Sequence, residues 1–242
     1  MSNKAIYKRV ILKISGEGLC PPGGFGVHRE PIDRIVAELA PVLDLNVQLG
    51  IVVGGGNFLR GAQFTDELGV PAATADYMGM LGTVLNALAL RERLEASGRP
   101  TRIQSALAIA RVGEPFDRQR CLRHFDKGRV VILAAGTGNP HVTTDSCAAM
   151  RAVELQAEAV LKATKVDGVY DDDPARNSNA RLYTTVTYDE VIDRRLRVMD
   201  IGATDICQQH QMPIIVFNLF KADTLRRVIL GEPLGTRVVN AT

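Results

Sequence analysis

Residues 130–158, VVILAAGTGNPHVTTDSCAAMRAVELQAE, contain the pattern that decides the fold. The first five are apolar and mostly β-branched, which favours a buried strand. The run Gly136-Thr-Gly-Asn-Pro140 interrupts the strand, and Thr144-Asp145 then offers a cap to an apolar-periodic helix. Strand, glycine-rich turn and helix start together suit a phosphate, because the backbone can approach a ligand and the first helical N–H groups are free. An ordinary strand-to-helix loop with a Thr/Asp cap would look the same.

A second glycine-rich turn strengthens the phosphate interpretation. Residues 46–53 favour a strand that ends in Gly54-Gly-Gly-Asn57, with Arg60 one helical turn further on. Open α/β sheets bind ligands at the carboxyl ends of their strands, so both turns would line one crevice. The strand expected over residues 8–15 carries Lys13 near the same end. A buried lysine is costly unless it faces a cleft, although a snorkelling edge lysine remains an alternative.

The rest of the chain alternates strands and helices. Further strands are expected over residues 102–105, 158–163, 214–218 and 236–239. A helix is expected to begin at Pro31, and others over residues 74–97, 117–125, 188–195, 203–210 and 225–230. The alternation predicts an α/β fold: a single three-layer αβα sandwich with a mainly parallel central sheet, formed by one domain over residues 1–242.

The helix expected over residues 74–97 is apolar on two sides. One side includes Met78, Leu81, Leu85 and Leu88, and the other includes Met80, Val84 and Ala87. Such breadth indicates burial by the sheet and by a second subunit, or a helix covered entirely within its own domain.

Composition excludes several classes of protein. The 242 residues are 46% hydrophobic and 23% charged, and a formal charge of +2 argues against a general nucleic-acid or membrane partner. Four scattered cysteines without a C-x-x-C pair predict reduced thiols and a cytoplasmic protein, with neither a zinc site nor a redox dithiol. Many arginines lie between Arg91 and Arg129, and they fit either solvated helix faces or an anionic effector site.

Common catalytic fingerprints are missing from the sequence. There is no G-x-x-x-x-G-K-[ST] or G-x-S-x-G, and His141 stands where a third Rossmann glycine would follow Gly138. What remains is a phosphate cleft with Lys13, Lys162 and Lys165 at strand ends. The spacing of the last two would put them on opposite faces of one strand, so only one of them is expected to reach a phosphate.

Five motifs in order resemble those of the bacterial uridylate kinases, which belong to the amino acid kinase superfamily. The motifs are Lys13-Ile-Ser-Gly16, Gly54-Gly-Gly-Asn57 with Arg60, Asp76-Tyr-Met-Gly-Met80, Ala135-Gly-Thr-Gly-Asn-Pro140 with Thr143-Thr-Asp145, and Lys162-Ala-Thr-Lys-Val-Asp-Gly-Val169. The resemblance covers nearly the whole chain. It implies transfer of the γ-phosphoryl group from Mg-ATP to UMP, with Mg²⁺ bound through ATP phosphates and waters.

The same resemblance implies roles for individual residues. Lys13 would neutralise the transferring group, Lys162 would assist from the ATP side, Asp145 would hold both ammonium groups, and Arg60 would fork onto a phosphate. The UMP side, mainly in the N-terminal part, would comprise Gly55, Asp76, Thr137, Gly138, Asn139, Pro140, His141, Val142, Thr143 and Thr144. The ATP side, mainly in the C-terminal part, would comprise Lys13, Ile14, Ser15, Gly16, Gly56, Arg60, Thr164, Tyr170 and Asp173. Asp200 would lie near the lysines or merely cap a helix.

The resemblance also implies regulation. Relatives are usually homohexamers inhibited by UTP, and many are activated by GTP at a site matched here by Arg91, Arg102 and Arg129. Glu95 and Arg118 depart from the pattern of GTP-responsive relatives, which predicts weak or absent GTP activation. Two alternatives stay open: an amino acid kinase that forms an acyl phosphate, and a regulatory protein that binds uridine nucleotides without turnover.

Overall fold

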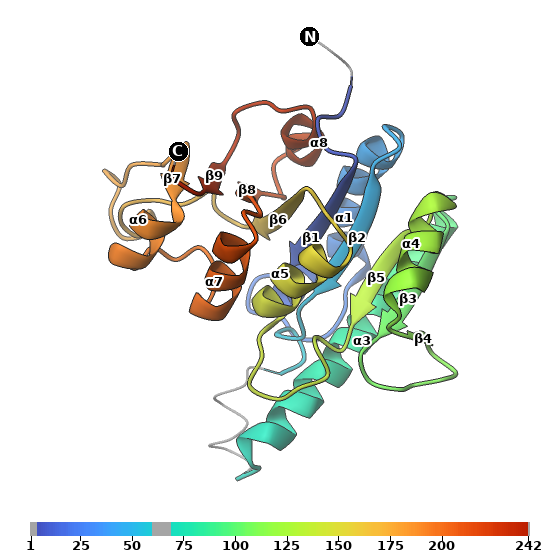
Figure 1. The fold of residues 1–242 in the computed structure, drawn as a ribbon. Coiled ribbons are helices and arrows are strands. Elements are labelled where there is room, and N and C mark those ends of the chain that lie inside the picture. The colour runs from blue at the N-terminus through green and yellow to red at the C-terminus, as the bar shows by residue number, and fades with distance from the viewer. Residues whose placement is uncertain (1–3, 60–68, 242) are drawn as a thin grey trace.

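The computed structural model describes residues 4–59 and 69–241, and Arg60 therefore lies outside the described residues. Its strands form one nine-stranded sheet in the order β4-β3-β5-β2-β1-β6-β8-β9-β7 (Figure 1). The strands are β1 (Arg9–Ile14), β2 (Gln48–Val53), β3 (Thr101–Ser105), β4 (Glu114–Pro115), β5 (Val130–Ala134), β6 (Ala159–Thr164), β7 (Thr185–Thr187), β8 (Ile214–Asn218) and β9 (Thr236–Val239). Among these strands only the β8–β9 pair is antiparallel.

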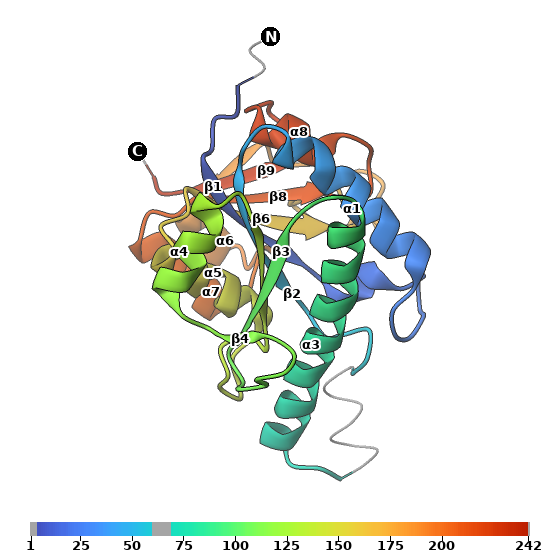
Figure 2. The ribbon, with the colours of Figure 1, turned by 90° about the vertical axis from the view of Figure 1, so that its right-hand side faces the viewer.

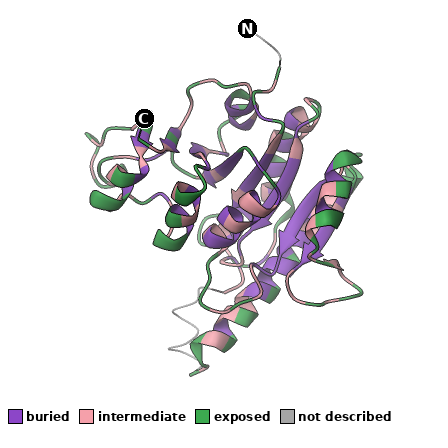
Figure 3. Ribbon diagram, in the orientation of Figure 1, coloured by how far each residue is buried: buried purple, intermediate pink, exposed green. Residues whose placement is uncertain are grey.

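Helices cover both faces of the sheet, which confirms the predicted three-layer α/β fold. One layer contains α1 (Arg29–Leu43), α3 (Ala72–Ala96) and α8 (Thr224–Ile229). The other contains α4 (Arg118–Asp126), α5 (Thr144–Glu154), α6 (Tyr188–Asp193) and α7 (Ile201–Gln209) (Figure 2). A short 3-10 helix, η1 (Gly16–Leu19), follows β1. The strands between the two layers are buried almost throughout, whereas the outer helical faces are exposed (Figure 3).

The period of two along each strand decides which layer a side chain meets. Leu12 on β1 packs with the α1, α3 and α8 layer, and Ile11 packs with the α5 layer. Lys13 therefore shares the face of Ile11. On β6 the same alternation gives Lys162 the face of Val160, which also belongs to the α5 layer. The alternation of side chains along β1 and β6 is therefore enough to direct both lysines toward α5.

The strands expected from sequence are found, and three of them, β5, β8 and β9, have the expected bounds. Only α6 begins at the predicted residue, and the other predicted helices begin one or two residues away. Helix α1 begins at Arg29, so Pro31 is its third residue, which the free N–H groups of a first turn tolerate. Helix α5 is capped by Thr143, and Thr144 is its first residue. The two short edge strands β4 and β7 were not predicted, because two or three residues carry no periodicity.

The two apolar sides expected on helix α3 are found, but they differ in burial within this chain. Met80, Val84 and Ala87 are buried in the core, whereas Leu81 and Leu85 are each 49% exposed. Within the described residues, no helix combines the length and the apolar character needed to span a membrane.

Candidate functional site

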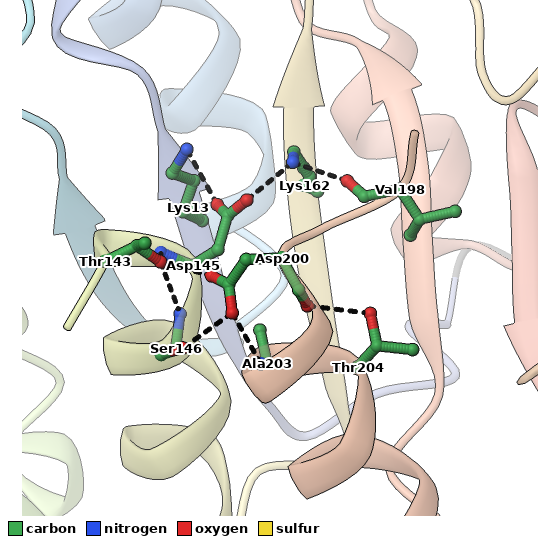
Figure 4. A network of polar contacts seen from close by, with 9 residues as sticks. All are labelled: Lys13, Thr143, Asp145, Ser146, Lys162, Val198, Asp200, Ala203 and Thr204. Carbon is green, nitrogen blue, oxygen red and sulfur yellow. Dashed lines mark hydrogen bonds and ion pairs between the residues drawn. The ribbon is translucent and has the colours of Figure 1, made fainter. Parts of the chain in front are cut away.

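Two lysines and one aspartate meet at the carboxyl end of the central strands (Figure 4). Lys13 Nζ lies 2.8 Å from Asp145 Oδ1, and Lys162 Nζ lies 2.7 Å from Asp145 Oδ2. Lys162 also donates to the backbone carbonyl of Val198. The three charged side chains are 12–17% exposed, so their charges interact more strongly than they would in water. With all three ionised the cluster carries one net positive charge, which suits an anionic ligand.

The first turn of α5 fixes the aspartate. Thr143 accepts hydrogen bonds from the backbone N–H groups of Asp145 and Ser146, each at 3.1 Å, and so caps the helix. Its own hydroxyl donates to the carboxylate of Asp200. Ser146 Oγ donates to the same carboxylate at 2.9 Å, and Ala203 N donates to it at 2.9 Å. Asp200 therefore caps α7 and joins it to α5, and its carboxylate contacts hydroxyl and backbone groups rather than the lysines.

Burial and hydrogen bonding set the charge states of two of these groups. Burial lowers the pKa of Lys162, and Lys13 lowers it further, while Asp145 opposes both effects. Burial would raise the pKa of Asp200, but hydrogen bonds from Thr143, Ala203 and Ser146 outweigh it and hold that pKa below its ordinary value. An anion placed beside Lys162 would favour its charged form.

The turn after β2 comes within van der Waals distance of its neighbours. A Cβ on Gly16 would lie 2.5 Å from Asn57 Oδ1, and one on Gly55 would lie 2.4 Å from the carbonyl oxygen of Gly79. Asn57 and Asn86 exchange two side-chain hydrogen bonds at 2.8 and 2.7 Å, and both are buried. Neither Gly16 nor Gly55 can therefore be replaced by a larger residue without displacing the neighbouring backbone.

The turn after β5 is tied to α3 at two points. Ala135 N donates to Thr83 Oγ1 at 2.7 Å, and His141 N donates to Asp76 Oδ2 at 2.7 Å. Backbone φ angles are positive at Ala135, Gly136, Gly138 and His141. This left-handed backbone is cheap for glycine and costly for Ala135 and His141. The predicted UMP-side residues Gly55, Asp76 and Thr137–Thr144 are therefore brought to one edge of the sheet, at the ends of β2 and β5.

The predicted ATP-side residues lie along the same sheet edge, at β1 and β6. Ile14 and Ser15 follow Lys13 at the end of β1, Gly56 lies in the turn after β2, and Thr164 ends β6. Tyr170 and Asp173 lie beyond β6, where Tyr170 forms an isolated antiparallel bridge with Leu182. Lys165 lies outside the strand, with its Nζ 4.0 Å from Glu17, so Lys162 is the lysine of the pair that faces α5.

The predicted effector arginines are only partly brought together. Arg91 and Arg102 line a hollow of about 680 Å³ between α3, β3 and β4. Arg129 is not among its lining residues, and its Nη1 lies 3.2 Å from His124 Nδ1. Glu95 also lines the hollow, and its Oε1 accepts from Arg102 Nη1 at 3.1 Å and from Thr101 N at 2.7 Å.

Sequence reasoning missed two parts of this site. The carbonyl of Val198, which binds Lys162, is a backbone group and has no signature in sequence. Asn86 could have been found, because it is a polar residue on the buried side of α3, next to Ala87. Its Nδ2 also donates to the carbonyl of Gly54 at 2.7 Å, so it braces the glycine turn.

Comparisons with known proteins agree over nearly the whole chain. Residues 8–218 match the model of the amino acid kinase family. A uridylate kinase of Methylococcus capsulatus is 48% identical over 234 residues, which cover 97% of this chain and 98% of the relative. The crystal structure of UMP kinase from Bacillus anthracis superposes with a TM-score of 0.94 at 35% identity, covering 98% and 97% of the two chains. UMP kinase from Ureaplasma parvum gives a TM-score of 0.89 at 32% identity, covering 96% and 99%.

Proposed function

The chain belongs to the amino acid kinase family, and we propose on that premise that it is a uridylate kinase, which transfers the γ-phosphoryl group of ATP to UMP in pyrimidine nucleotide biosynthesis. The products are UDP and ADP. The observation that carries the choice of acceptor is the full-length similarity to a uridylate kinase, at 48% identity. The buried Lys–Asp–Lys cluster supplies the physical rationale for the chemistry.

The order of strands supports a division between acceptor and donor. Gly55 follows β2 and residues 137–144 follow β5, and both strands lie on one side of β1. Thr164 ends β6 and Tyr170 follows it, on the other side of β1. We therefore assign UMP to the side formed mainly by the N-terminal part and ATP to the side formed mainly by the C-terminal part. Lys13 and Lys162 lie between the two.

Phosphoryl transfer requires two anions to approach each other. Two unit charges 4 Å apart interact by about 1 kcal/mol in water and about 4 kcal/mol at an effective dielectric near 20, so charge neutralisation counts for more in a cleft than on a surface. Lys13 on β1 would neutralise the transferring group, and Lys162 on β6 would assist from the donor side. Asp145 holds both ammonium groups in place and would not itself contact phosphate. Arg60, outside the described residues, is proposed as a further phosphate ligand.

We assign Mg²⁺ to ATP rather than to a protein cage. Among the described residues, no group of three or more histidine, cysteine or acidic side chains is placed to hold a metal, and the Asp145 carboxylate is engaged by two lysines. Cationic residues beside a glycine-rich backbone fit the phosphates of a magnesium–nucleotide complex. Magnesium bound with ATP supplies further neutralisation of the β- and γ-phosphate charge.

Asp76 is the proposed ligand of the UMP ribose. A carboxylate can accept hydrogen bonds from both ribose hydroxyl groups, as acidic residues do in dinucleotide folds. Asp76 Oδ2 accepts from His141 N at 2.7 Å, which orients the carboxylate and ties it to the turn after β5. This hydrogen bond to Oδ2 also fixes the direction of the other carboxylate oxygen, Oδ1.

The quaternary structure and regulation are proposed by analogy with uridylate kinases. We propose a homohexamer inhibited by UTP. An apolar stripe on α3, formed by Tyr77, Leu81 and Leu85, is 44–49% exposed and offers a surface for a second subunit. Action in the cytoplasm, without nucleic-acid or membrane partners, stays a prediction.

Release of ADP in a coupled assay tests the function. The purified protein is supplied with Mg-ATP and, in separate reactions, with UMP, CMP or acetylglutamate. Turnover with UMP at a kcat/KM well above the other two supports a uridylate kinase. Preference for acetylglutamate would replace it with the acyl-phosphate-forming alternative, and tight UMP binding without ADP release would support the regulatory alternative.

A further inference from the structure

Two arginine side chains donate hydrogen bonds to carbonyl groups at the C-terminal end of α5. Arg118 Nε donates to the carbonyl oxygen of Glu154 at 2.6 Å, and Arg9 Nη1 donates to that of Leu155 at 2.6 Å. The last carbonyls of a helix have no partner within it, and positive charge is favoured at that end. We call the following set of side chains the arginine clamp: Arg9, Arg118, Arg151 and Phe116.

The buried member of the clamp is Arg151. Its side chain is 8% exposed, and its Nη1 lies 2.6 Å from Glu154 Oε2. The Cζ atom lies 3.5 Å from the centroid of the Phe116 ring, so the guanidinium stacks closely on the ring. Phe116 lies between β4 and α4, two residues before Arg118. The segment 116–118 therefore contacts α5 twice, once through a ring and once through a hydrogen bond.

The opposite end of α5 carries the aspartate of the site. Asp145 binds Lys13 of β1, and Leu155, at the far end, binds Arg9 of the same strand. The four residues from Arg9 to Lys13 span about 13 Å of strand. The ten from Asp145 to Leu155 span about 15 Å of helix, so the two attachments match in length. Helix α5 consequently runs antiparallel along β1 (Figure 1), and these two contacts fix it to the strand at both ends.

We propose that the arginine clamp sets the axial position of α5 and thereby places the Asp145 carboxylate between Lys13 and Lys162. Arg151 and Phe116 are thus positioning residues for phosphoryl transfer, an inference that rests on the proposed function. Arg151 lies six residues from Asp145 along α5, and Arg151 and Phe116 act on the site only through this helix. A displacement near 1 Å at a reacting centre can cost on the order of a hundredfold in rate, so a slight slip of α5 would be measurable.

The test compares Arg151→Lys and Phe116→Leu with the wild-type enzyme. Arg151→Lys keeps the positive charge but loses the planar guanidinium that stacks on Phe116. Phe116→Leu removes the aromatic ring from the same contact. Both variants are expected to lower kcat by about tenfold. The KM for ATP should stay within about twofold, because none of the proposed ATP ligands lies on α5. The KM for UMP should rise as kcat falls, because Thr143 and Thr144, at the start of α5, are among the proposed UMP ligands. Phe116→Tyr keeps the ring and should retain the wild-type kcat.

A matched control distinguishes the positioning role of the clamp from a role in stability alone. Leu225→Ala empties a buried position on α8, on the other face of the sheet, and should lower the melting temperature without lowering kcat. Assays run well below every melting temperature then compare folded enzymes. Equal kcat losses in Leu225→Ala and Arg151→Lys, or wild-type kcat in both clamp variants, would overturn the proposal.

A double variant tests whether the clamp acts through the aspartate. In an Asp145→Asn background, Arg151→Lys should cause no further loss of kcat, because the group that the clamp positions is already gone. A further loss of about tenfold would show an independent effect and refute the positioning role. Failure of the wild-type enzyme to phosphorylate UMP would instead refute the proposed function.

Discussion

Lys13 and Lys162 lie opposite one another in register on the neighbouring strands β1 and β6. Two ammonium groups placed side by side repel, and the carboxylate of Asp145 bridges them. Asp145 balances one of the two cations, and the Asp200 carboxylate acts on Lys162 without contacting it, at the sheet edge where both glycine turns begin. The arrangement is therefore most stable when an anion is added, and it suits a phosphoryl group in transit.

Removal of Lys13 should affect chemistry far more than binding. A positioned donor that acts on developing charge is worth about 3 kcal/mol, so Lys13→Ala should lower kcat by a hundredfold or more. Binding of UMP, measured by calorimetry, should change only a few-fold, because the proposed UMP ligands lie at β2, β5 and α3. Lys8→Ala, an exposed lysine just before the same strand, serves as the control and should keep the wild-type kcat. Unchanged turnover in Lys13→Ala would refute its assigned role.

Two glycines in contact should respond oppositely to alanine. A Cβ on Gly55 would lie 2.4 Å from the carbonyl oxygen of Gly79, so Gly55→Ala should cost about 1–3 kcal/mol of unfolding free energy and raise the KM for UMP. Gly79 lies inside α3 with no atom within 4 Å of its would-be Cβ, so Gly79→Ala should add about 0.5–1 kcal/mol. Urea unfolding measures both. A neutral Gly55→Ala would mean that the turn can move away from α3.

Asp200 should contribute stability that is lost in acid. Its folded-state pKa lies below the ordinary value, so the contribution is complete above the unfolded pKa, near 3.9, and disappears as pH falls through the folded pKa. Asp200→Asn should therefore be less stable than wild type at pH 7 and should lose less stability between about pH 5 and pH 3. Urea unfolding across this range makes the comparison, with the exposed Asp193→Asn as control. Parallel curves for Asp200→Asn and wild type would contradict the assignment.

The fold and the lysines at the strand ends could be predicted because they have local signatures, whereas the grouping of Asp145 with the two lysines was implied only by the resemblance to uridylate kinases. Buried strands such as β5 are continuous apolar runs, and Lys13 stands out as a charge within one. The sequence suggested Thr144-Asp145 as the cap of α5, whereas the extended backbone and the hydroxyl of Thr143 make that residue the cap. The contact between Lys162 and the carbonyl of Val198 depends on how the α6–α7 connection packs, and a backbone oxygen has no residue type to reveal it.

The choice of which apolar side of α3 is buried could not be predicted from the sequence either. Its two apolar sides were evident in sequence, but periodicity could not tell which side faces the core. Met80 and Val84 are buried, whereas Leu81 and Leu85 are half exposed. Tertiary packing makes this choice, since both sides have comparable hydrophobicity.

GTP should have little effect at the hollow beside α3, because the Glu95 carboxylate already binds Arg102, one of the arginines that line it. Its carboxylate binds Arg102 Nη1 at 3.1 Å and Thr101 N at 2.7 Å, where a phosphate would compete with it and be repelled by it. Steady-state rates at subsaturating UMP should therefore change less than about twofold with added GTP, since an exposed charge in the hollow interacts only modestly with an anion. Glu95→Gln removes the repulsion and should tighten GTP binding measured by calorimetry. Asp193→Asn, which removes an exposed carboxylate outside the hollow, tests for a general charge effect. A several-fold rise in the wild-type rate would show that an anion displaces Glu95 readily and would overturn this prediction.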